Sequence, residues 1–209
     1  MNMIKINGYD KNKKIYDIFG LLGMTISIII PAYNEEKRIG KTIENYLEFF
    51  HDAEIFITMD GCKDRTLDIV KKFAENRDKN NNTVSYIHSD KRLGKGMGLL
   101  RAIDHTKGDI LVFTDADDAT SPSEIFRLIN SLDGCDCVIG SRWINGSVII
   151  VKQPIQRRIA SRGFNFLVRT MFGLPFKDTQ CGAKVLRKEA IKNIFMDMMH
   201  HTYFFLTNK

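Results

Sequence analysis

The chain has 209 residues, of which 44% are hydrophobic, 27% charged and 10% aromatic. This composition excludes a disordered chain and provides enough apolar residues for one sizeable buried core. The formal net charge of +6 favours an anionic partner, such as a nucleotide phosphate, an anionic lipid or a nucleic acid, without choosing among them.

An uncharged segment near the N-terminus has two interpretations. It runs from Ile18 to Asn34 and follows several lysines, as a signal peptide or membrane span would. Glycines and a proline interrupt it, and it is shorter than the ~20 apolar residues that a spanning helix needs. We therefore predict a buried strand over Thr25–Ile30 and no transmembrane helix. Residues 1–23 are expected to form an extension that is poorly ordered or not native, with Met24 as the start of the domain.

Short β-branched segments alternate with helical periodicity after this strand. Such alternation predicts an α/β fold, with a mostly parallel sheet covered by helices on both faces. The further predicted strands are Glu54–Thr58, Val84–His88, Asp109–Phe113 and Asp136–Gly140. The predicted helices are Glu35–Phe50 capped by Asn34, one that begins at Asp64 or Thr66, Lys95–Lys107, and one that begins at Pro122 after Ser121.

The carboxyl ends of four predicted strands are followed by polar and charged residues. Ligands of open α/β sheets bind beyond these ends, so the side chains are expected to converge on one edge. This convergence of carboxylates, cations and glycines favours a binding site over a set of unrelated turns. The four segments are Pro31–Glu36, Asp60–Asp64, Lys91–Gly96 and Asp115–Asp118.

Two carboxylates that follow an apolar strand, Asp115 and Asp117, are the most informative of these residues. They repel each other unless a cation lies beside them. Mg²⁺ and Mn²⁺ take oxygen ligands and share them with substrate phosphates, so the pair predicts a divalent metal site that neutralises charge on a diphosphate leaving group. The alternative is a solvated acidic turn in which Asp118 or Ser121 caps the next helix.

Two neighbouring segments suit a nucleotide. Lys95 lies between two glycines at a predicted helix start, where backbone N–H groups and its ammonium group would favour a phosphate. The P-loop spacing is absent, which argues against kinase or ATPase chemistry. Asp60 is placed to accept hydrogen bonds from a nucleobase or ribose; alternatively, it is only part of an Asp-Gly turn.

The cysteines indicate a cellular compartment, and the lack of certain motifs argues against one class of partner. The four cysteines lack the spacing of a zinc knuckle and are expected to be reduced thiols in a reducing compartment. Nucleic-acid binding is not expected, because the chain has neither an aromatic-basic strand motif nor a recognisable helix-turn-helix.

Four ordered motifs resemble those of the family-2 inverting glycosyltransferases. They are Ile28–Glu36, Asp60–Gly61, Gly94–Gly96 and Thr114–Asp117. Residues 178–184 resemble the branch that makes dolichyl- or polyprenyl-phosphate sugars, and are more similar to the dolichyl-phosphate β-glucosyltransferases than to the mannose synthases. The resemblance covers residues 24–186. It departs from the family where Met59 replaces an acid and Cys62 a serine, and where the family continues beyond the end of this chain.

The resemblance implies a single GT-A domain, which is a Rossmann-like fold with a mostly parallel sheet. Residues 24–140 would form the nucleotide-sugar-binding core, and residues 141–209 a basic, acceptor-side and membrane-proximal region. It also implies roles for individual residues. The nucleoside would be surrounded by Pro31, Ala32, Tyr33, Glu35 and Asp60, the metal bound by Asp115 and Asp117, and the phosphates or acceptor held near Lys95, Arg142 and Asp178–Gln180.

A basic segment near the C-terminus predicts contact with a membrane. Arg158, Arg162 and Arg169 recur at roughly helical spacing among apolar residues. Such a helix can lie in a lipid interface, where each cation near an anionic surface adds about 1 kcal/mol. The alternative is a helix packed on the sheet with its arginines in water. Because the resemblance is to enzymes of lipid phosphates, we expect a peripheral protein at the cytoplasmic face of a membrane.

The expected reaction is a single displacement with inversion, from UDP-glucose by preference or from GDP-mannose, to a dolichyl or polyprenyl phosphate. The residues assigned to this chemistry are Asp117, Asp178, Gln180 and Arg142. An ionised acceptor phosphate needs little general-base help, whereas a glycan hydroxyl would need Asp178 or Asp118. Two alternatives stay open, namely a glycan-hydroxyl acceptor and a truncated fragment that binds nucleotide sugar without turnover.

Overall fold

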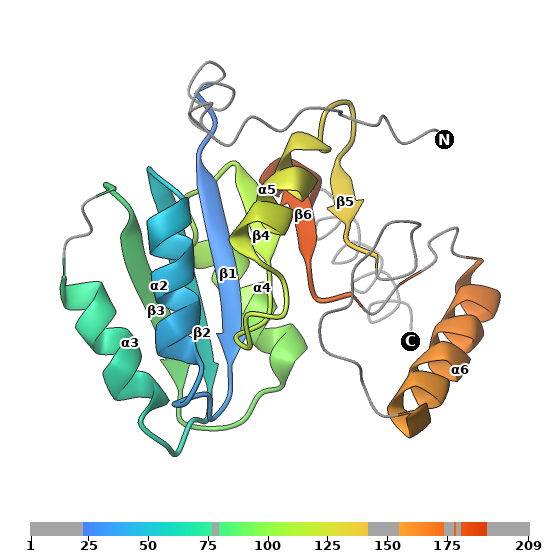
Figure 1. Cartoon of the computed structure of the whole chain (residues 1–209), viewed down its shortest axis with the longest axis horizontal. Coiled ribbons are helices and arrows are strands. Elements are labelled where there is room, and N and C mark those ends of the chain that lie inside the picture. The colour runs from blue at the N-terminus through green and yellow to red at the C-terminus, as the bar shows by residue number, and fades with distance from the viewer. Residues whose placement is uncertain (1–22, 77–79, 142–154, 174–177, 179–180, 192–209) are drawn as a thin grey trace, which may run out of the picture.

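A six-stranded β-sheet forms the centre of the computed structural model, which describes residues 23–76, 80–141, 155–173, 178 and 181–191 (Figure 1). Its strands, in the order in which they lie side by side, are β3 (Thr83–Ser89), β2 (Ala53–Asp60), β1 (Ile26–Ala32), β4 (Ile110–Phe113), β6 (Lys184–Arg187) and β5 (Cys137–Ile139). The helices are α2 (Ile39–Phe49), α3 (Thr66–Glu75), α4 (Lys95–His105), α5 (Pro122–Asn130) and α6 (Ile155–Phe172).

The sheet is mostly parallel, which confirms the predicted fold class. Strands β1 to β4 pair in parallel, whereas β6 pairs antiparallel with both β4 and β5. The strand β5 was predicted, but β6 was not, because its sequence Lys-Val-Leu-Arg is short and bounded by cations. The strand order shows that the segment beyond residue 140 contributes a strand to the sheet, between β4 and β5.

Helices cover both faces of the sheet, and the strands alternate between them. Helices α2, α3 and α5 lie on the face toward the viewer in Figure 1, and α4 lies behind. In β1, Ile28 and Ile30 belong to the core cluster under the front helices, whereas Ile29 packs with Ala102 of α4. Successive side chains of a strand point to opposite faces. A strand buried on both faces therefore has the continuous apolar sequence that β1 shows.

The start of α2 differs from the prediction, which placed it at Glu35 with Asn34 as its cap. The helix begins at Ile39. Asn34 has a left-handed φ of 54°, and its side-chain oxygen accepts a hydrogen bond from the backbone N–H of Lys63 at 2.8 Å. The carbonyl of Glu35 instead accepts from Arg38 and Ile39, which forms a turn. Asn34 therefore joins two loops and does not cap a helix.

Helix α6 lies to one side of the sheet in Figure 1. It has 18 residues and carries a high proportion of exposed apolar side chains in its described part. No helix in the described ranges combines the length and the apolar composition that crossing a membrane requires.

Candidate active site

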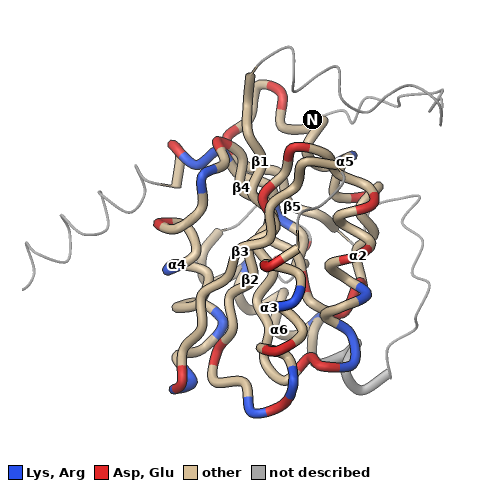
Figure 2. Tube along the Cα trace, turned by 90° about the vertical axis from the view of Figure 1, so that its left-hand side faces the viewer, with Lys and Arg blue, Asp and Glu red and all other residues tan. Residues whose placement is uncertain are grey.

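The loops after β1, β2 and β4 and the start of α4 meet at the carboxyl edge of the sheet. Because the three strands are parallel neighbours, they deliver the residues that follow them to the same side. Acidic and basic residues lie close together along this edge, which is the lower one in Figure 2. The structure therefore brings the four predicted segments to one place.

Asp60, the last residue of β2, fixes the loop that leads to α4. Asp60 is 8% exposed. Its Oδ1 accepts a hydrogen bond from the backbone N–H of Leu93 at 2.6 Å, and its Oδ2 accepts one from Gly94 at 2.8 Å. Both oxygens of this buried charge thus have partners, which offsets the cost of its desolvation. The predicted nucleoside residue therefore also holds the segment around Lys95 against the sheet.

Tyr33, which follows β1, carries a cation against its ring. The guanidinium carbon of Arg92 lies 4.0 Å from the ring centroid, a cation–π contact. Tyr33 is exposed, whereas Pro31 is half-buried and Ala32 is buried. Of these three residues, Tyr33 therefore offers the most surface to a ligand. No individual role was predicted for Arg92, because an arginine in a loop carries no signal of its partner.

Glu35 lies in the loop after β1 and is bonded to the segment that follows β2. The Glu35 backbone N–H donates to Thr66 Oγ1 at 2.8 Å, and its carboxylate lies 2.6 Å from the Arg38 guanidinium. Asp64 accepts hydrogen bonds from Thr66 and from the backbone N–H of Glu36. Burial raises the pKa of Asp64, but these hydrogen bonds outweigh it, and the pKa lies below its ordinary value. Asp64 therefore stays ionised near neutral pH and joins the two loops.

The two carboxylates predicted to bind metal flank a buried residue. Ala116 is 4% exposed and packs in the core, while Asp115 and Asp117 on either side reach solvent. The Lys95 Nζ lies 2.5 Å from Asp115 Oδ1. The backbone N–H of Ala119 donates to Asp117 Oδ1 at 3.1 Å. Folding thus places an ammonium group from α4 against one of the two carboxylates.

The carboxylates of Asp115 and Asp117 fit a hard divalent cation that also binds phosphate. The described residues contain no cluster of three or more His, Cys, Asp or Glu side chains placed to hold a metal. Two carboxylates that leave the other positions to a diphosphate are common at Mg²⁺ sites. Helix α5 is capped by Ser121, whose Oγ accepts from the Glu124 N–H. Of the two caps that the sequence suggested, Asp118 and Ser121, the structure shows Ser121.

The segment that leads into β6 lies against Asp115. A β-carbon on Gly182 would lie 2.7 Å from Asp115 Cγ, closer than any real contact of this kind. Asp178, in the same segment, is 2% exposed. Gln180 and Arg142, which were also predicted to act on the reacting groups, lie outside the described residues. Gly182 was not predicted as a site residue, because the need for glycine arises only from this contact.

Replacing Gly182 with alanine is expected to lower turnover by about 10- to 100-fold, as changes to the supporting groups of a metal site commonly do. The φ of Gly182 is not left-handed, so the cost arises from the contact with Asp115 and not from backbone strain. The matched control is Gly163→Ala on α6, where an added β-carbon meets nothing within 4 Å. Steady-state kinetics of both variants checks this; equal turnover would show that Asp115 tolerates displacement.

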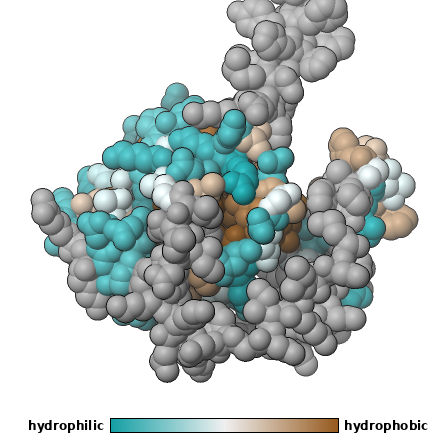
Figure 3. All heavy atoms as spheres, turned by 90° about the horizontal axis from the view of Figure 1, so that it is seen from above, coloured by the Kyte–Doolittle hydropathy of each residue, from teal (hydrophilic) through white to brown (hydrophobic). Residues whose placement is uncertain are grey.

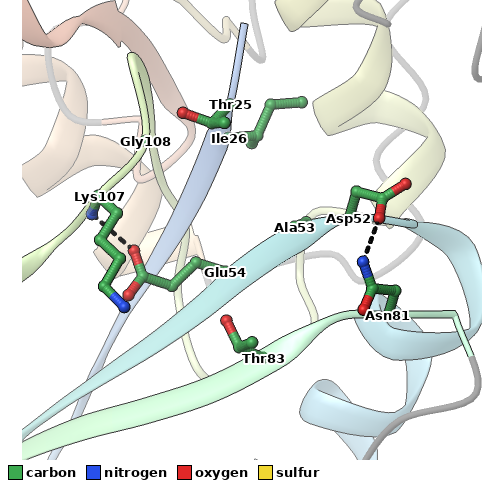
Figure 4. Close-up of a pocket in the computed structure, with 9 residues that line it drawn as sticks. All are labelled: Thr25, Ile26, Asp52, Ala53, Glu54, Asn81, Thr83, Lys107 and Gly108. Carbon is green, nitrogen blue, oxygen red and sulfur yellow. Dashed lines mark hydrogen bonds between the residues drawn. The ribbon is translucent and has the colours of Figure 1, made fainter. Parts of the chain in front are cut away.

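A small cleft of about 170 Å³ lies at the opposite, amino edge of the sheet (Figure 4). Glu54, in its wall, accepts hydrogen bonds from Ser27 Oγ at 2.5 Å and from the backbone N–H of Lys107 at 2.8 Å. Asn81 donates to Asp52 at its rim. The buried Glu54 carboxylate is therefore satisfied by its own surroundings and joins β1, β2 and the loop before β4.

Comparison with known proteins identifies relatives over most of the chain. The sequence profile described as Glycosyl transferase family 2 matches residues 27–195. Glycosyltransferase AglD of Haloferax volcanii is 34% identical over 193 residues, which are 88% of this chain and 30% of that protein. Dolichyl-phosphate beta-glucosyltransferase ALG5D of Trichomonas vaginalis is 30% identical over 203 residues, which are 90% of this chain and 61% of that protein. The chain thus spans less than two thirds of the length of either relative.

Solved structures with the same fold include two nucleotide-sugar complexes. Mannosyltransferase PcManGT of Pyrobaculum calidifontis, with GDP-Man and Mn²⁺, has a TM-score of 0.58 and 21% identity over 82% of this chain and 46% of that chain. Glucosyl-3-phosphoglycerate synthase of Mycobacterium tuberculosis, with Mn²⁺, UDP-Glc and phosphoglyceric acid, has a TM-score of 0.59 and 22% identity over 87% of this chain and 63% of that chain. This likeness confirms the predicted GT-A arrangement.

Proposed function

The chain belongs to glycosyl transferase family 2, and from this premise we propose that it transfers a sugar, glucose by preference, from a nucleotide diphosphate to a polyprenyl phosphate. The observation that carries the proposal is the contact of Lys95 with Asp115, two residues before Asp117, at the carboxyl edge of the sheet. The name of the Trichomonas relative supports glucose as the sugar and dolichyl phosphate as the acceptor. GDP-mannose is the second donor to test.

The donor would be held by residues of three loops. A divalent metal, Mg²⁺ or Mn²⁺, bound by Asp115 and Asp117 would neutralise the charge that develops on the departing diphosphate. Lys95 would donate to the same phosphates, since its ammonium group already lies at Asp115. The exposed Tyr33 ring would contact the nucleoside, and Asp60 would shape its site by holding the loop of Leu93 and Gly94.

The acceptor would attack the anomeric carbon in line with the leaving diphosphate. A phosphate acceptor is ionised near neutral pH and needs no general base. Of the two carboxylates considered as bases for a hydroxyl acceptor, Asp178 is poorly placed because it is only 2% exposed, whereas Asp118 is exposed and accepts a hydrogen bond from Asn45 at 2.6 Å. The burial of Asp178 and the name of the Trichomonas relative support a phosphate over a glycan hydroxyl. Arg142, with Gln180, is the group we propose for orienting that phosphate.

The test is to offer radiolabelled UDP-glucose and GDP-mannose with a polyprenyl phosphate and, separately, with soluble glycans. We expect labelled lipid from UDP-glucose with a polyprenyl phosphate. Label found only in the glycans would show that the acceptor is a glycan hydroxyl and not a lipid phosphate. Binding of UDP without any product would identify a chain that binds nucleotide sugar without turnover.

We also propose that α6 brings the chain to the cytoplasmic face of a membrane. Its apolar side chains Phe164, Leu167 and Met171 recur at helical spacing and are each more than half exposed. Arg162 and Arg169 are also exposed, and their spacing places them on the opposite side of the helix. The apolar side chains of α6 stand at the right of Figure 3. A basic helix with an exposed apolar stripe is typical of interfacial binding, and the four free cysteines suit a reducing compartment.

Replacing Leu167 and Met171 together with serine is expected to weaken binding to vesicles of phosphatidylcholine and phosphatidylglycerol by about tenfold or more, because two apolar side chains no longer enter the lipid. The matched control replaces Met97 and Leu100 with serine; these two side chains lie on α4 and are also exposed. Vesicle co-sedimentation compares the two. Equal loss in both variants, or none in either, would exclude α6 as the contact.

A further inference from the structure

Helix α2 presents three polar side chains to the loop that follows β4. Thr42, Asn45 and Tyr46 are spaced three and four residues apart, which places them on one side of the helix. Thr42 and Tyr46 are fully buried. Buried polar groups need hydrogen-bond partners, so the hydroxyl groups of Thr42 and Tyr46 are expected to be hydrogen-bonded within the protein.

Two of these side chains bond on either side of Asp117. The Thr42 hydroxyl donates to the backbone carbonyl of Ala116 at 2.9 Å, and the Asn45 amide donates to the carboxylate of Asp118 at 2.6 Å. Asp118 has a left-handed φ of 56°, which turns the chain at this point. The residues before and after Asp117 are thus both tied to α2.

Tyr46 spans the two ends of the same loop. Its hydroxyl lies 3.1 Å from the carbonyl of Thr120, which can only accept, and 3.2 Å from the hydroxyl of Thr114. Tyr46 therefore donates to Thr120 and accepts from Thr114. Burial raises the pKa of Tyr46 well above its usual range, so the hydroxyl keeps its proton at any working pH.

We propose that Thr42, Asn45 and Tyr46 are positioning residues that hold Asp115 and Asp117 in the arrangement that binds a divalent cation. The anchored loop residues are Thr114, Ala116, Asp118 and Thr120, and the carboxylates of Asp115 and Asp117 between them reach solvent. Lys95 offsets the charge of Asp115, and the bonds to α2 hold the backbone on both sides of Asp117. This inference rests on the metal role proposed above for Asp115 and Asp117.

The test measures Mn²⁺ binding by the full chain in the presence of saturating UDP, from the electron paramagnetic resonance signal of free Mn²⁺. Tyr46→Phe keeps the ring and removes the hydroxyl, and is expected to weaken Mn²⁺ binding about tenfold. Asn45→Ala serves as a second variant that is expected to fold, because alanine is the better helix former. Asn45→Ala should also weaken Mn²⁺ binding.

The matched control pairs Thr42→Val with Thr106→Val. Both threonines are buried, and both hydroxyls donate to a backbone carbonyl, that of Ala116 for Thr42 and that of Ile103 for Thr106. Thr106 follows α4 near the amino edge of the sheet, away from the acidic loop. The two variants should lose similar stability, whereas only Thr42→Val should lose Mn²⁺ affinity.

A second readout separates positioning from a general loss of structure. If the loop is only loosened, excess Mn²⁺ should restore part of the turnover of Tyr46→Phe, while the KM for the acceptor stays unchanged. Wild-type Mn²⁺ affinity in all three α2 variants would overturn the positioning role and leave the metal site intact. A wild-type chain that binds no Mn²⁺ with UDP would overturn the metal site and the positioning role together.

Discussion

Replacing Asp117 with asparagine is expected to lower sugar transfer by about 10³-fold or more. The change keeps the shape of the side chain and removes one of the two negative charges that would hold the metal. A bound metal contributes several kcal/mol of transition-state stabilisation, which corresponds to this loss of rate. Because Asp117 is exposed, the free energy of unfolding should change by less than about 0.5 kcal/mol.

The matched control for this variant is Asp104→Asn, an exposed carboxylate on α4 with the same change of charge. Turnover is measured with saturating donor and acceptor, and folding by circular dichroism. Retention of a tenth or more of wild-type turnover by Asp117→Asn would remove this carboxylate from the chemistry. A tenfold loss in Asp104→Asn would show that net charge, and not metal ligation, is responsible.

Replacing Asp60 with asparagine is expected to weaken UDP binding by about 10- to 100-fold. An amide has one accepting oxygen, so it cannot accept from both Leu93 and Gly94, and its NH₂ group would face a backbone donor. The unpaired buried donor costs about 1–3 kcal/mol. The loop that carries Lys95 is then no longer held in place, and donor affinity should fall with it.

Calorimetric titration with UDP checks this prediction, at a temperature where the variant is folded. The control is Asp52→Asn, which precedes the other end of β2 and is exposed. Asparagine tolerates the left-handed φ of 53° at that position and can still accept from Asn81. If Asp60→Asn lowers stability but binds UDP as tightly as wild type, Asp60 supports the fold without shaping the nucleotide site.

The carboxyl edge of the sheet could be predicted because local sequence determines it. Parallel strands buried on both faces have continuous apolar sequences, and β1, β2 and β4 end close to where these sequences end. The position of Asp60 and of Asp115 followed directly from those strand ends. The cap of α5 by Ser121 was equally local, since a serine before a proline at a helix start is a strong signal.

Contacts between distant segments could not be predicted. The ring of Tyr33 meets Arg92, and Gly182 meets Asp115, only because the sheet places their loops together. Asparagine is a favoured helix-cap residue, yet the side chain of Asn34 accepts a hydrogen bond from Lys63 in the neighbouring loop and caps no helix. Tyr46 has the spacing of an apolar core residue, and only the folded chain shows the partners of its hydroxyl.

The measurement that tests the central claim most directly is transfer of labelled glucose from UDP-glucose to a polyprenyl phosphate, with Mn²⁺ and again with excess EDTA. We predict labelled lipid with the metal, loss of nearly all product with EDTA, and recovery when Mn²⁺ is restored in excess. Product that forms equally well in EDTA would contradict a metal held by Asp115 and Asp117.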